Sequence, residues 1–334
     1  MSMNHYLVTG GAGFVGSNLV ADLMKKGHKV TVLDNLFTGK LENLSEWLNN
    51  PNFKFIKGDV IDPNVFSEYE TDPAKDSGKP KLIFTHIFHL ACPASPPAYM
   101  HDPIHTLQTC FLGTMYMLEL ASKQNARMLF TSTSEIYGDP EVTPQPETYW
   151  GQVNCRGPRS CYDEGKRSAE TLCLEYREKR KVEIRVARLF NCYGPNMDPN
   201  DGRVVSNMII AALTNKPLQI YGDGKQTRSF TYVSDTIRGL ELLIESDYKD
   251  PVNLGNPSCE CTIGKFAEVI RDAVGNQNVK IENVAAVIDD PQKRRPNIEV
   301  AERVLGWHPE IPLEEGLRYT IEYYKTIIAK QNNK

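Results

Sequence analysis

A glycine-rich turn between a strand and a helix is the feature that most restricts the fold of this chain. The stretch YLVTGGAGFVGSNLV, residues 6–20, starts with an apolar run, continues through Gly10, Gly11, Gly13 and Gly16, and ends in a helical pattern. Glycines at this spacing allow a tight turn, let a pyrophosphate approach the backbone, and let helix and strand pack closely. The first amides of the helix then face the anion. The stretch therefore predicts a dinucleotide-binding α/β unit.

The first half of the chain repeats this alternation of strand and helix. Short apolar runs that we expect to be strands occur at residues 5–10, 29–34, 53–60, 86–91, 126–133 and 183–191. Amphipathic stretches, which we expect to be helices, occur at 15–27 and 105–124. The alternation predicts an α/β fold with a Rossmann-type doubly wound parallel sheet, covered by helices on both faces. The polar, turn-rich residues 68–81 predict an exposed loop.

The pattern changes after about residue 190, where turns such as YGPN and YGDGKQ become frequent. We predict an NAD-binding Rossmann domain over residues 1–190. A smaller C-terminal substrate-binding lobe is expected mainly over 191–330, with a segment of about 225–256 returning to the first domain. A chain of 334 residues is long enough for this division.

Composition excludes several classes of function. The net charge of -4 argues against a nucleic-acid partner, and no apolar run approaches the roughly 20 residues of a membrane span. We expect no secretion signal at the start of the chain. Eight dispersed cysteines are typical of reduced thiols, so we predict a cytoplasmic protein. His86 and His89, three apart in an expected strand, point to opposite faces, so we predict no metal site there.

Acidic residues end two of the expected strands. Asp34 follows the glycine loop by about 20 residues, where a carboxylate binds ribose hydroxyls and repels a 2′-phosphate. The residues after it, Asn35-Leu36-Phe37-Thr38-Gly39, include no arginine, which favours NAD over NADP. Asp59 ends the third strand, where it could bind an adenine edge or cap a helix.

Tyr162 and Lys166 form the candidate catalytic pair. They are four residues apart in a helical pattern and so lie on one face of the helix. An ammonium beside a phenol favours the phenolate and lowers the pKa of the tyrosine, as a general base requires.

The chain resembles the extended short-chain dehydrogenase/reductase family, and within it the UDP-glucuronate decarboxylases. The residues that carry the resemblance are GGAGFVGSNL, DNLFTG, PASPPAYM, TSTSEIYGDPEV, CYDEGKRSAET, NDGRVVSN, YGDGKQTRSFTYVSD and DDPQKRRPNI, and they span nearly the whole sequence. The resemblance implies a UDP-sugar substrate, NAD as a bound cofactor, and a homodimer formed through helices near 105–123 and 162–179.

The resemblance also implies residue roles. Tyr162 would be the base on the sugar 4-hydroxyl, Lys166 would hold the nicotinamide ribose, Thr133 would orient the substrate, and Glu135 would act near the sugar acid. The implied cofactor-binding residues are Gly10, Gly13, Phe14, Val15, Gly16, Asp34, Asn35, Phe37, Thr38, Gly39, Asp59, Val60, Leu90, Cys92, Thr106, Tyr162 and Lys166. The implied substrate-binding residues are Tyr99, Glu135, Asn191, Arg203, Tyr221, Arg228 and Arg294. The chain departs from the family pattern at Cys92 and Cys110, where we would expect Ser and Asn.

The expected reaction oxidises the 4-hydroxyl, so that the sugar acid becomes a β-keto acid and loses carbon dioxide, and then reduces the ketone. A nucleotide-sugar 4,6-dehydratase is the nearest alternative, followed by a 4-epimerase and a non-catalytic NAD-binding regulator. Dehydratases typically carry an Asp-Glu pair where this chain has Ser134-Glu135, and a serine is a poor acid for the departure of a hydroxyl.

Overall fold

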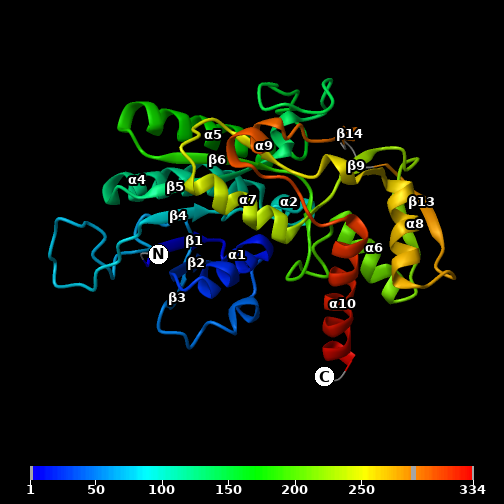
Figure 1. Cartoon of the computed structure of the whole chain (residues 1–334), viewed down its shortest axis with the longest axis horizontal. Coiled ribbons are helices and arrows are strands. Elements are labelled where there is room, and N and C mark those ends of the chain that lie inside the picture. Colours follow the sequence, from blue (N-terminus) through cyan, green and yellow to red (C-terminus); the bar gives the residue numbers. More distant parts are fainter. Residues whose placement is uncertain (1–2, 287–290, 333–334) are drawn as a thin grey trace.

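A seven-stranded parallel sheet forms the centre of the large domain (Figure 1). The computed structural model describes residues 3–286 and 291–332. The sheet has the order β11-β6-β5-β4-β1-β2-β3, and every neighbouring pair in it is parallel. Its strands are β1 (His5–Thr9), β2 (Lys29–Asp34), β3 (Phe53–Lys57), β4 (His86–His89), β5 (Arg127–Thr133), β6 (Ile184–Leu189) and β11 (Val252–Leu254). The Rossmann-type fold and the six expected strands are confirmed, although the first, third, fourth and sixth end one to three residues earlier than expected.

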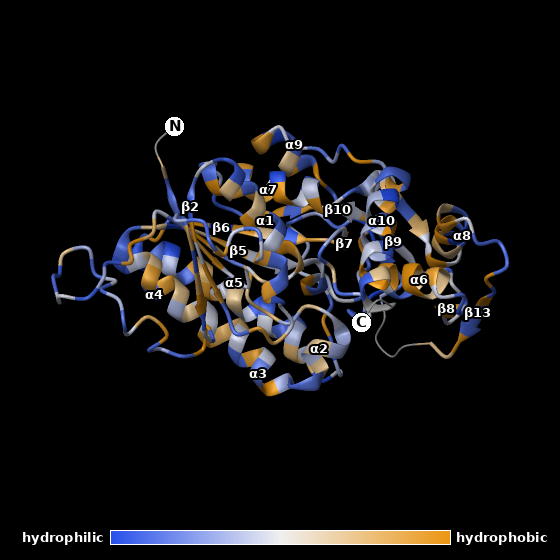
Figure 2. Cartoon of the chain, turned by 90° about the horizontal axis from the view of Figure 1, so that it is seen from below, coloured by the Kyte–Doolittle hydropathy of each residue, from blue (hydrophilic) through white to orange (hydrophobic). Residues whose placement is uncertain are grey.

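Helices cover both faces of this sheet, as the near-continuous apolar strands predict. One face carries α1 (Phe14–Lys25), α7 (Val233–Glu245) and α9 (Glu299–Leu305), and the other carries α4 (Thr114–Gln124) and α5 (Ser160–Arg180). Figure 2 shows the two layers on opposite sides of the strands. Each layer contributes its own apolar cluster to the core, with Leu19 and Leu240 in one and Leu118 and Ala169 in the other.

The expected helix over 105–124 is interrupted by an irregular turn. It consists of α3 (Pro103–Gln108), a π-helical turn η2 (Thr109–Gly113) and α4, and is preceded by α2 (Pro96–His101). Single π turns inside helices occur frequently at functional sites. This turn packs against α5, which carries Tyr162 and Lys166.

The second lobe has a third apolar cluster of its own, built from residues such as Ile209, Phe266 and Leu317. It lies beyond one end of the sheet (Figure 1). Its helices are α6 (Val204–Leu213), α8 (Ile263–Val274) and α10 (Leu313–Asn332). Its short strands are β8 (Leu218–Tyr221), β9 (Thr227–Ser229), β12 (Glu260–Thr262), β13 (Ile281–Val284) and β14 (Lys293–Arg294). The strands β7 (Cys192–Tyr193) and β10 (Thr231–Tyr232) pair between the lobes, after which α7 and β11 return to the large sheet.

The remaining elements are short. The 3-10 turns are η1 (Leu41–Leu44), η3 (Ser134–Tyr137) and η4 (Pro257–Cys259). Residues 68–81 form the expected loop, which is largely exposed and projects from the side of the sheet away from the second lobe (Figure 1). Among the described residues, no helix is both long and apolar enough to cross a bilayer.

The strand order places the site. Strand β1 has β2 on one side and β4 on the other. The strand order therefore reverses at β1. Ligands of open parallel sheets bind at the carboxyl ends of strands at such a switch point. The glycine loop follows β1, the segment with Cys92 follows β4, and Thr133 ends β5. All three therefore lie at one edge.

The packing predicts unequal effects for two tryptophans. Trp307 is fully buried between α7 and α9, and its indole N–H donates to the backbone oxygen of Asp235 at 2.9 Å. We expect Trp307→Ala to lower the free energy of unfolding by about 3–5 kcal/mol in a denaturant titration. The matched control is Trp150→Ala, because Trp150 is 88% exposed and its loss should change stability by less than about 0.5 kcal/mol. Equal effects would contradict this account of the core.

Candidate active site

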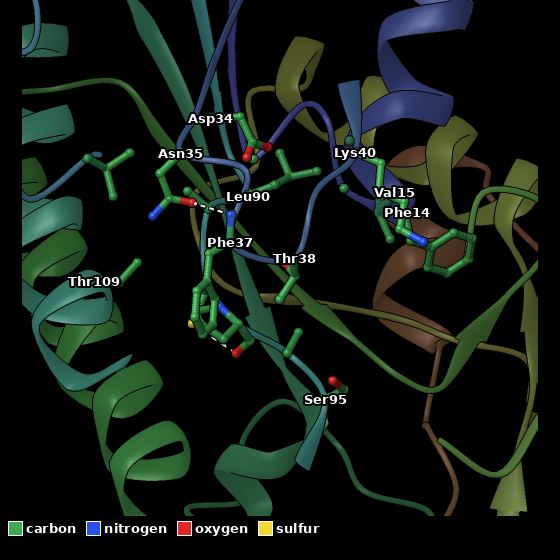
Figure 3. Close-up of a pocket in the computed structure, with 18 of the residues that line it drawn as sticks. Phe14, Val15, Asp34, Asn35, Phe37, Thr38, Lys40, Leu90, Ser95 and Thr109 are labelled. Carbon is green, nitrogen blue, oxygen red and sulfur yellow. Dashed lines mark hydrogen bonds between the residues drawn. The ribbon is translucent and has the colours of Figure 1, made fainter. Parts of the chain in front are cut away.

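A pocket at the carboxyl ends of β1, β2 and β4 gathers most of the predicted cofactor residues (Figure 3). Those that line it are Gly10, Gly13, Phe14, Val15, Gly16, Asp34, Asn35, Phe37, Thr38, Asp59, Val60, Leu90 and Cys92. They come from four segments that are separate in sequence and follow β1, β2, β3 and β4. Figure 3 shows the segment after β2 and the segment after β4 facing each other across this pocket.

The glycine loop fits a pyrophosphate. Gly13 precedes α1, and no side chain caps that helix N-terminus, so its first amides keep their capacity to bind an anion. A Cβ on Gly16 would lie 2.2 Å from the backbone oxygen of Gly10, so a side chain here would push the helix away from the turn. A dinucleotide therefore meets backbone rather than side chains at this end of the pocket.

Asp34 offers a buried carboxylate at the position expected for ribose. Its Oδ2 accepts from the Ala12 N–H at 2.9 Å and its Oδ1 accepts from the Leu36 N–H at 2.8 Å. Burial raises the pKa of Asp34, while these two amides act against that rise. Each oxygen keeps a second lone pair for a hydroxyl donor. These free acceptor positions therefore fit the hydroxyls of an unphosphorylated ribose, as in NAD.

Asp59 does not cap a helix and is instead part of a small polar cluster. Its Oδ2 accepts from Asn35 Nδ2 at 2.7 Å and contacts His105 Nε2 at 2.8 Å, while its Oδ1 accepts from the Ile61 N–H at 3.1 Å. Burial alone would raise the pKa of Asp59, but the hydrogen bonds from Asn35 and His105 outweigh it and lower the pKa. His105 also lines the pocket, which the sequence did not indicate.

Four predicted cofactor residues do not line this pocket: Tyr162 and Lys166 line the adjoining larger pocket, and Thr106 and Gly39 line neither. The Thr106 side chain is fully buried, and its hydroxyl donates to the backbone oxygen of Tyr99 at 3.1 Å. Thr109, one turn later, lines the pocket instead, and Figure 3 shows it on the helical segment beside Asn35. Gly39 lies directly behind the lining, where an added Cβ would be 3.0 Å from Asp34 Oδ1. Thr106 as a cofactor contact therefore stays a prediction, and Thr109 is added as a candidate.

A larger pocket adjoins the first and extends under the second lobe. The residues that line both pockets are Val15, Leu90, Cys92, Ala94 and Arg203. The larger pocket brings together Thr133, Glu135, Tyr162 and Lys166, the four predicted catalytic residues. They come from the end of β5 and the first turns of α5. A substrate in this pocket would therefore meet a cofactor in the other across a shared wall.

The tyrosine-lysine pair is buried and held on both sides. Lys166 donates to the backbone oxygen of Thr131 at 2.9 Å, and its ammonium lies 5.9 Å from the centroid of the Tyr162 ring. On the other side the Tyr99 ring stacks on Tyr162, with centroids 5.0 Å apart and planes 8° apart. The predicted contact residue Tyr99 thus also positions the tyrosine.

Burial dominates the titration of the phenol. It raises the pKa of Tyr162 well above the usual value, and a hydrogen bond with Thr133 acts in the opposite direction. The expected lowering of this pKa by Lys166 is therefore not the main effect within the chain. A further positive charge beside the phenol is needed before Tyr162 can act as a base at neutral pH.

Glu135 is held between two arginines. Its Oε1 accepts from Arg294 Nη1 at 2.6 Å, and its Oε2 accepts from Arg159 Nη2. Burial alone would raise the pKa of Glu135, but the charges of Arg294 and Arg159 outweigh it and hold the pKa at about 2. Glu135 is therefore ionised at neutral pH and accepts hydrogen bonds rather than donating a proton.

Ser134 holds the same arginine. Its hydroxyl accepts from Arg294 Nη1 at 3.0 Å, and Arg294 also donates to the backbone oxygen of Gly138 at 3.1 Å. An aspartate at position 134 would place a second carboxylate beside Glu135 and this guanidinium. The serine and the carboxylate of the Ser134-Glu135 pair therefore act together on Arg294.

The predicted substrate-binding residues divide into two groups. Tyr99, Glu135, Asn191, Arg203, Tyr221 and Arg228 line the larger pocket. Arg294, only 2% exposed, lies behind Glu135 and is not among the described lining residues. Asp289 and Asp290, which begin the DDPQKRRPNI block, lie outside the described residues. Within the described part of the chain, no cluster of three or more His, Cys, Asp and Glu side chains could hold a metal.

Two charged residues of the site were missed. Arg159 lines the larger pocket beside Glu135, and its position one turn before Tyr162 on α5 could have indicated it. Asp163 is buried behind it, with a pKa of about 7, raised first by burial and then by the charge of Glu135. Both belong to the CYDEGKR region or its flank, where we considered only Tyr162 and Lys166.

Comparisons with known proteins agree with this geometry. The family model for GDP-mannose 4,6-dehydratases matches residues 7–320. UDP-glucuronic acid decarboxylase 1 of Xenopus tropicalis is 51% identical over 327 residues, which cover 98% of this chain and 73% of that protein.

Two solved structures share the fold. UDP-glucose 4-epimerase of Thermotoga maritima, solved with UDP-glucose, superposes with a TM-score of 0.84 at 29% identity, covering 97% of this chain and 99% of that one. A dTDP-glucose 4,6-dehydratase of Bacillus anthracis, solved with NAD, has a TM-score of 0.82 at 26% identity and covers 97% of each chain.

The buried ion pair predicts a stability effect. Glu135→Ala leaves the Arg294 charge buried without its carboxylate, so we expect the free energy of unfolding to fall by about 3–5 kcal/mol in urea titrations at pH 7. The control is Glu268→Ala, which removes an exposed pair with Lys265 and should leave stability nearly unchanged.

The same pair also predicts a pH dependence. The pKa of Glu135, about 2, lies below the value of about 4.3 expected in the unfolded chain. Its stabilisation is complete above pH ~4.3 and is lost as pH falls toward 2. The difference between wild type and Glu135→Ala should therefore narrow in acid. A difference that stays constant down to pH 2 would contradict the assignment.

Proposed function

The chain belongs to the UDP-glucuronic acid decarboxylase family of the extended short-chain dehydrogenases/reductases, and from this premise we propose that it converts UDP-glucuronate to UDP-xylose through a 4-keto intermediate. The enzyme uses NAD that is regenerated in each cycle. The Xenopus tropicalis UDP-glucuronic acid decarboxylase 1, which is 51% identical to this chain over 98% of its length, supports the proposal.

The charge of the larger pocket is the observation that carries this function. Among the described lining residues, Glu135 is the one acidic side chain, whereas the basic ones are Arg159, Lys166, Arg203, Lys216 and Arg228. A UDP-sugar acid brings a diphosphate and a carboxylate, which arginine binds by paired hydrogen bonds. We assign Arg203 and Arg228 to the diphosphate and Asn191 and Tyr221 to the nucleotide sugar.

The chain's residues supply proton transfer and orientation. NAD, when bound, would supply a positive charge near the phenol and a regenerated hydride acceptor for carbon 4, so that the reaction would involve no net oxidation. Thr133 orients the 4-hydroxyl, and Tyr162 takes its proton. Lys166, fixed by Thr131, holds the nicotinamide ribose. The resulting 4-ketone makes the sugar acid a β-keto acid, which loses carbon dioxide to give an enolate.

Protonation of carbon 5 needs a donor other than Glu135, because a group with a pKa of about 2 carries no proton at neutral pH. Glu135 instead holds a water or a sugar hydroxyl as an acceptor, while Arg159 restrains the carboxylate. Tyr162 then returns its proton to the 4-oxygen as the ketone is reduced. Glu135 and Arg159 thus orient groups around the reacting carbons.

The alternative reactions suit the site less well. A 4,6-dehydratase must protonate a leaving hydroxyl, and neither Ser134 nor the ionised Glu135 can do so. A 4-epimerase has no need of Glu135 or its two arginines. A non-catalytic regulator could lose Tyr162 or Lys166, whereas both are present and line the pocket.

We also propose a homodimer, formed by α3, η2, α4 and α5. Apolar side chains are exposed on this layer at Ile104, Leu107, Phe111 and Leu174. Covering such a surface with a second copy removes apolar area from water. We propose a cytoplasmic location, which the eight free thiols support.

Incubation of the purified protein with UDP-glucuronate and NAD should release carbon dioxide and form UDP-xylose, both measured by mass spectrometry. Tyr162→Phe should lower the rate by about 10²–10⁴-fold, because the proton acceptor is lost. The matched control is Tyr319→Phe on the exposed face of α10, which should retain wild-type activity. Loss of water from dTDP-glucose or UDP-glucose without decarboxylation of UDP-glucuronate would overturn the proposed function.

Ile104→Glu should convert the dimer to a monomer in sedimentation velocity, because a charge then replaces a side chain that is 71% exposed in the single chain and buried at the interface. Leu242→Glu on α7, which is 39% exposed on the opposite layer, should stay dimeric. A wild-type protein that sediments as a monomer would contradict the proposed dimer.

A further inference from the structure

Two cysteine side chains meet at the wall between the two pockets. Cys92 follows β4 and lines both the cofactor pocket and the substrate pocket. Cys110 lies in the π turn η2 and is only 1% exposed. Their Sγ atoms are 3.3 Å apart, although 18 residues separate them in the sequence. The proposed reaction makes no use of either thiol.

The surroundings make the two thiols unequal. Burial would raise the pKa of Cys92, but the hydrogen bond with Cys110 and the charge of Lys166 outweigh it and lower that pKa. The same hydrogen bond and burial raise the pKa of Cys110 well above its usual value. Cys92 is therefore the more readily ionised of the two thiols, and the Cys110 sulfur lies within hydrogen-bond distance of it. A partly accessible thiolate beside a protonated thiol is the arrangement in which one sulfur attacks and the other resolves.

We propose that Cys92 and Cys110 form a modification site, at which a small peroxide converts the two thiols to a disulfide and switches the enzyme off. The Cys92 thiolate attacks one peroxide oxygen, the O–O bond breaks, and Cys92 becomes a sulfenic acid as hydroxide leaves, which takes up the proton that Cys92 lost on ionising and gives the first water. The Cys110 sulfur then attacks the Cys92 sulfur, the S–S bond forms, and the departing hydroxide takes the Cys110 proton as a second water. Two thiols lose two electrons and two protons, and one peroxide is reduced to two waters.

The geometry links this bond to the active site. A disulfide needs the sulfurs at about 2.05 Å, so Cys92, Cys110 or both must move by more than 1 Å. Cys110 packs against α5 at Gly165. A Cβ added to Gly165 would lie only 3.0 Å from the Cys110 Sγ. Gly165 directly precedes Lys166, and Leu90 and Ala94 on the Cys92 segment line both pockets. Closure of the bond therefore displaces groups on both sides of the reacting centre.

The first experiment follows the bond itself. The full-length protein is treated with hydrogen peroxide, the remaining thiols are blocked with iodoacetamide, and the digest is analysed by mass spectrometry. We expect one peptide pair joined through Cys92 and Cys110, formed more slowly when NAD is added, because the cofactor covers Cys92. This readout does not depend on which reaction the enzyme catalyses.

The second experiment follows activity. Wild type should lose activity by about 100-fold on oxidation, as expected for groups displaced by about 1 Å, and recover it with dithiothreitol. Cys110→Ala and Cys110→Ser, each compared with its own untreated sample, should not show this reversible loss. Cys155→Ser, which alters an exposed thiol, should respond like wild type.

Three results would overturn the proposal. One is that iodoacetamide alkylates both Cys92 and Cys110 in oxidised, inactive protein, because both thiols would then still be reduced. Another is a cross-link that joins Cys161, whose partly buried thiol lies near Tyr99, to either sulfur in place of the expected pair. The third is full reversible inactivation of both Cys110 variants.

Discussion

The buried contact between Arg294 and the end of β5 is the interaction on which the site depends. Arg294 comes from β14 in the second lobe, and it reaches Ser134, Glu135 and the backbone of Gly138 at the edge of the large sheet. A guanidinium that is 2% exposed needs a paired charge, and Glu135 supplies it. The contact therefore joins the lobes and ionises Glu135 at the same time.

The contact between Glu135 and Arg294 explains which roles we give to the residues around Tyr162. Because Glu135 is committed to arginines, we assign proton transfer to Tyr162, whose ring stacks on Tyr99 and lies near Lys166. The pocket keeps a surplus of positive charge, which suits an anionic nucleotide sugar. The Cys92–Cys110 pair lies at the same wall. A movement of Cys92 or Cys110 would therefore change the lining of both the cofactor pocket and the substrate pocket.

Much of the fold and part of the candidate site were predictable from local patterns in the sequence. Apolar runs of strand length alternating with amphipathic helices leave little besides a parallel sheet, and the glycine loop with Asp34 follows from the needs of a dinucleotide. Packing adds features that local spacing does not show. The π turn interrupts the expected helix over 105–124, Thr109 lines the cofactor pocket, and nothing in the residues TCFLG predicts either.

The sequence by itself determined which chemical groups are available: the glycine turn, the acid at position 34, the Tyr162-Lys166 spacing and the Ser134-Glu135 pair. These depend on short-range order along one strand or helix. Only the tertiary structure decided the state of those groups. The pKa of Glu135, the placement of Arg294 behind it and the meeting of two sulfurs depend on segments 18 to 160 residues apart. Burial and Coulomb interactions act through space, so no spacing along the chain reveals them.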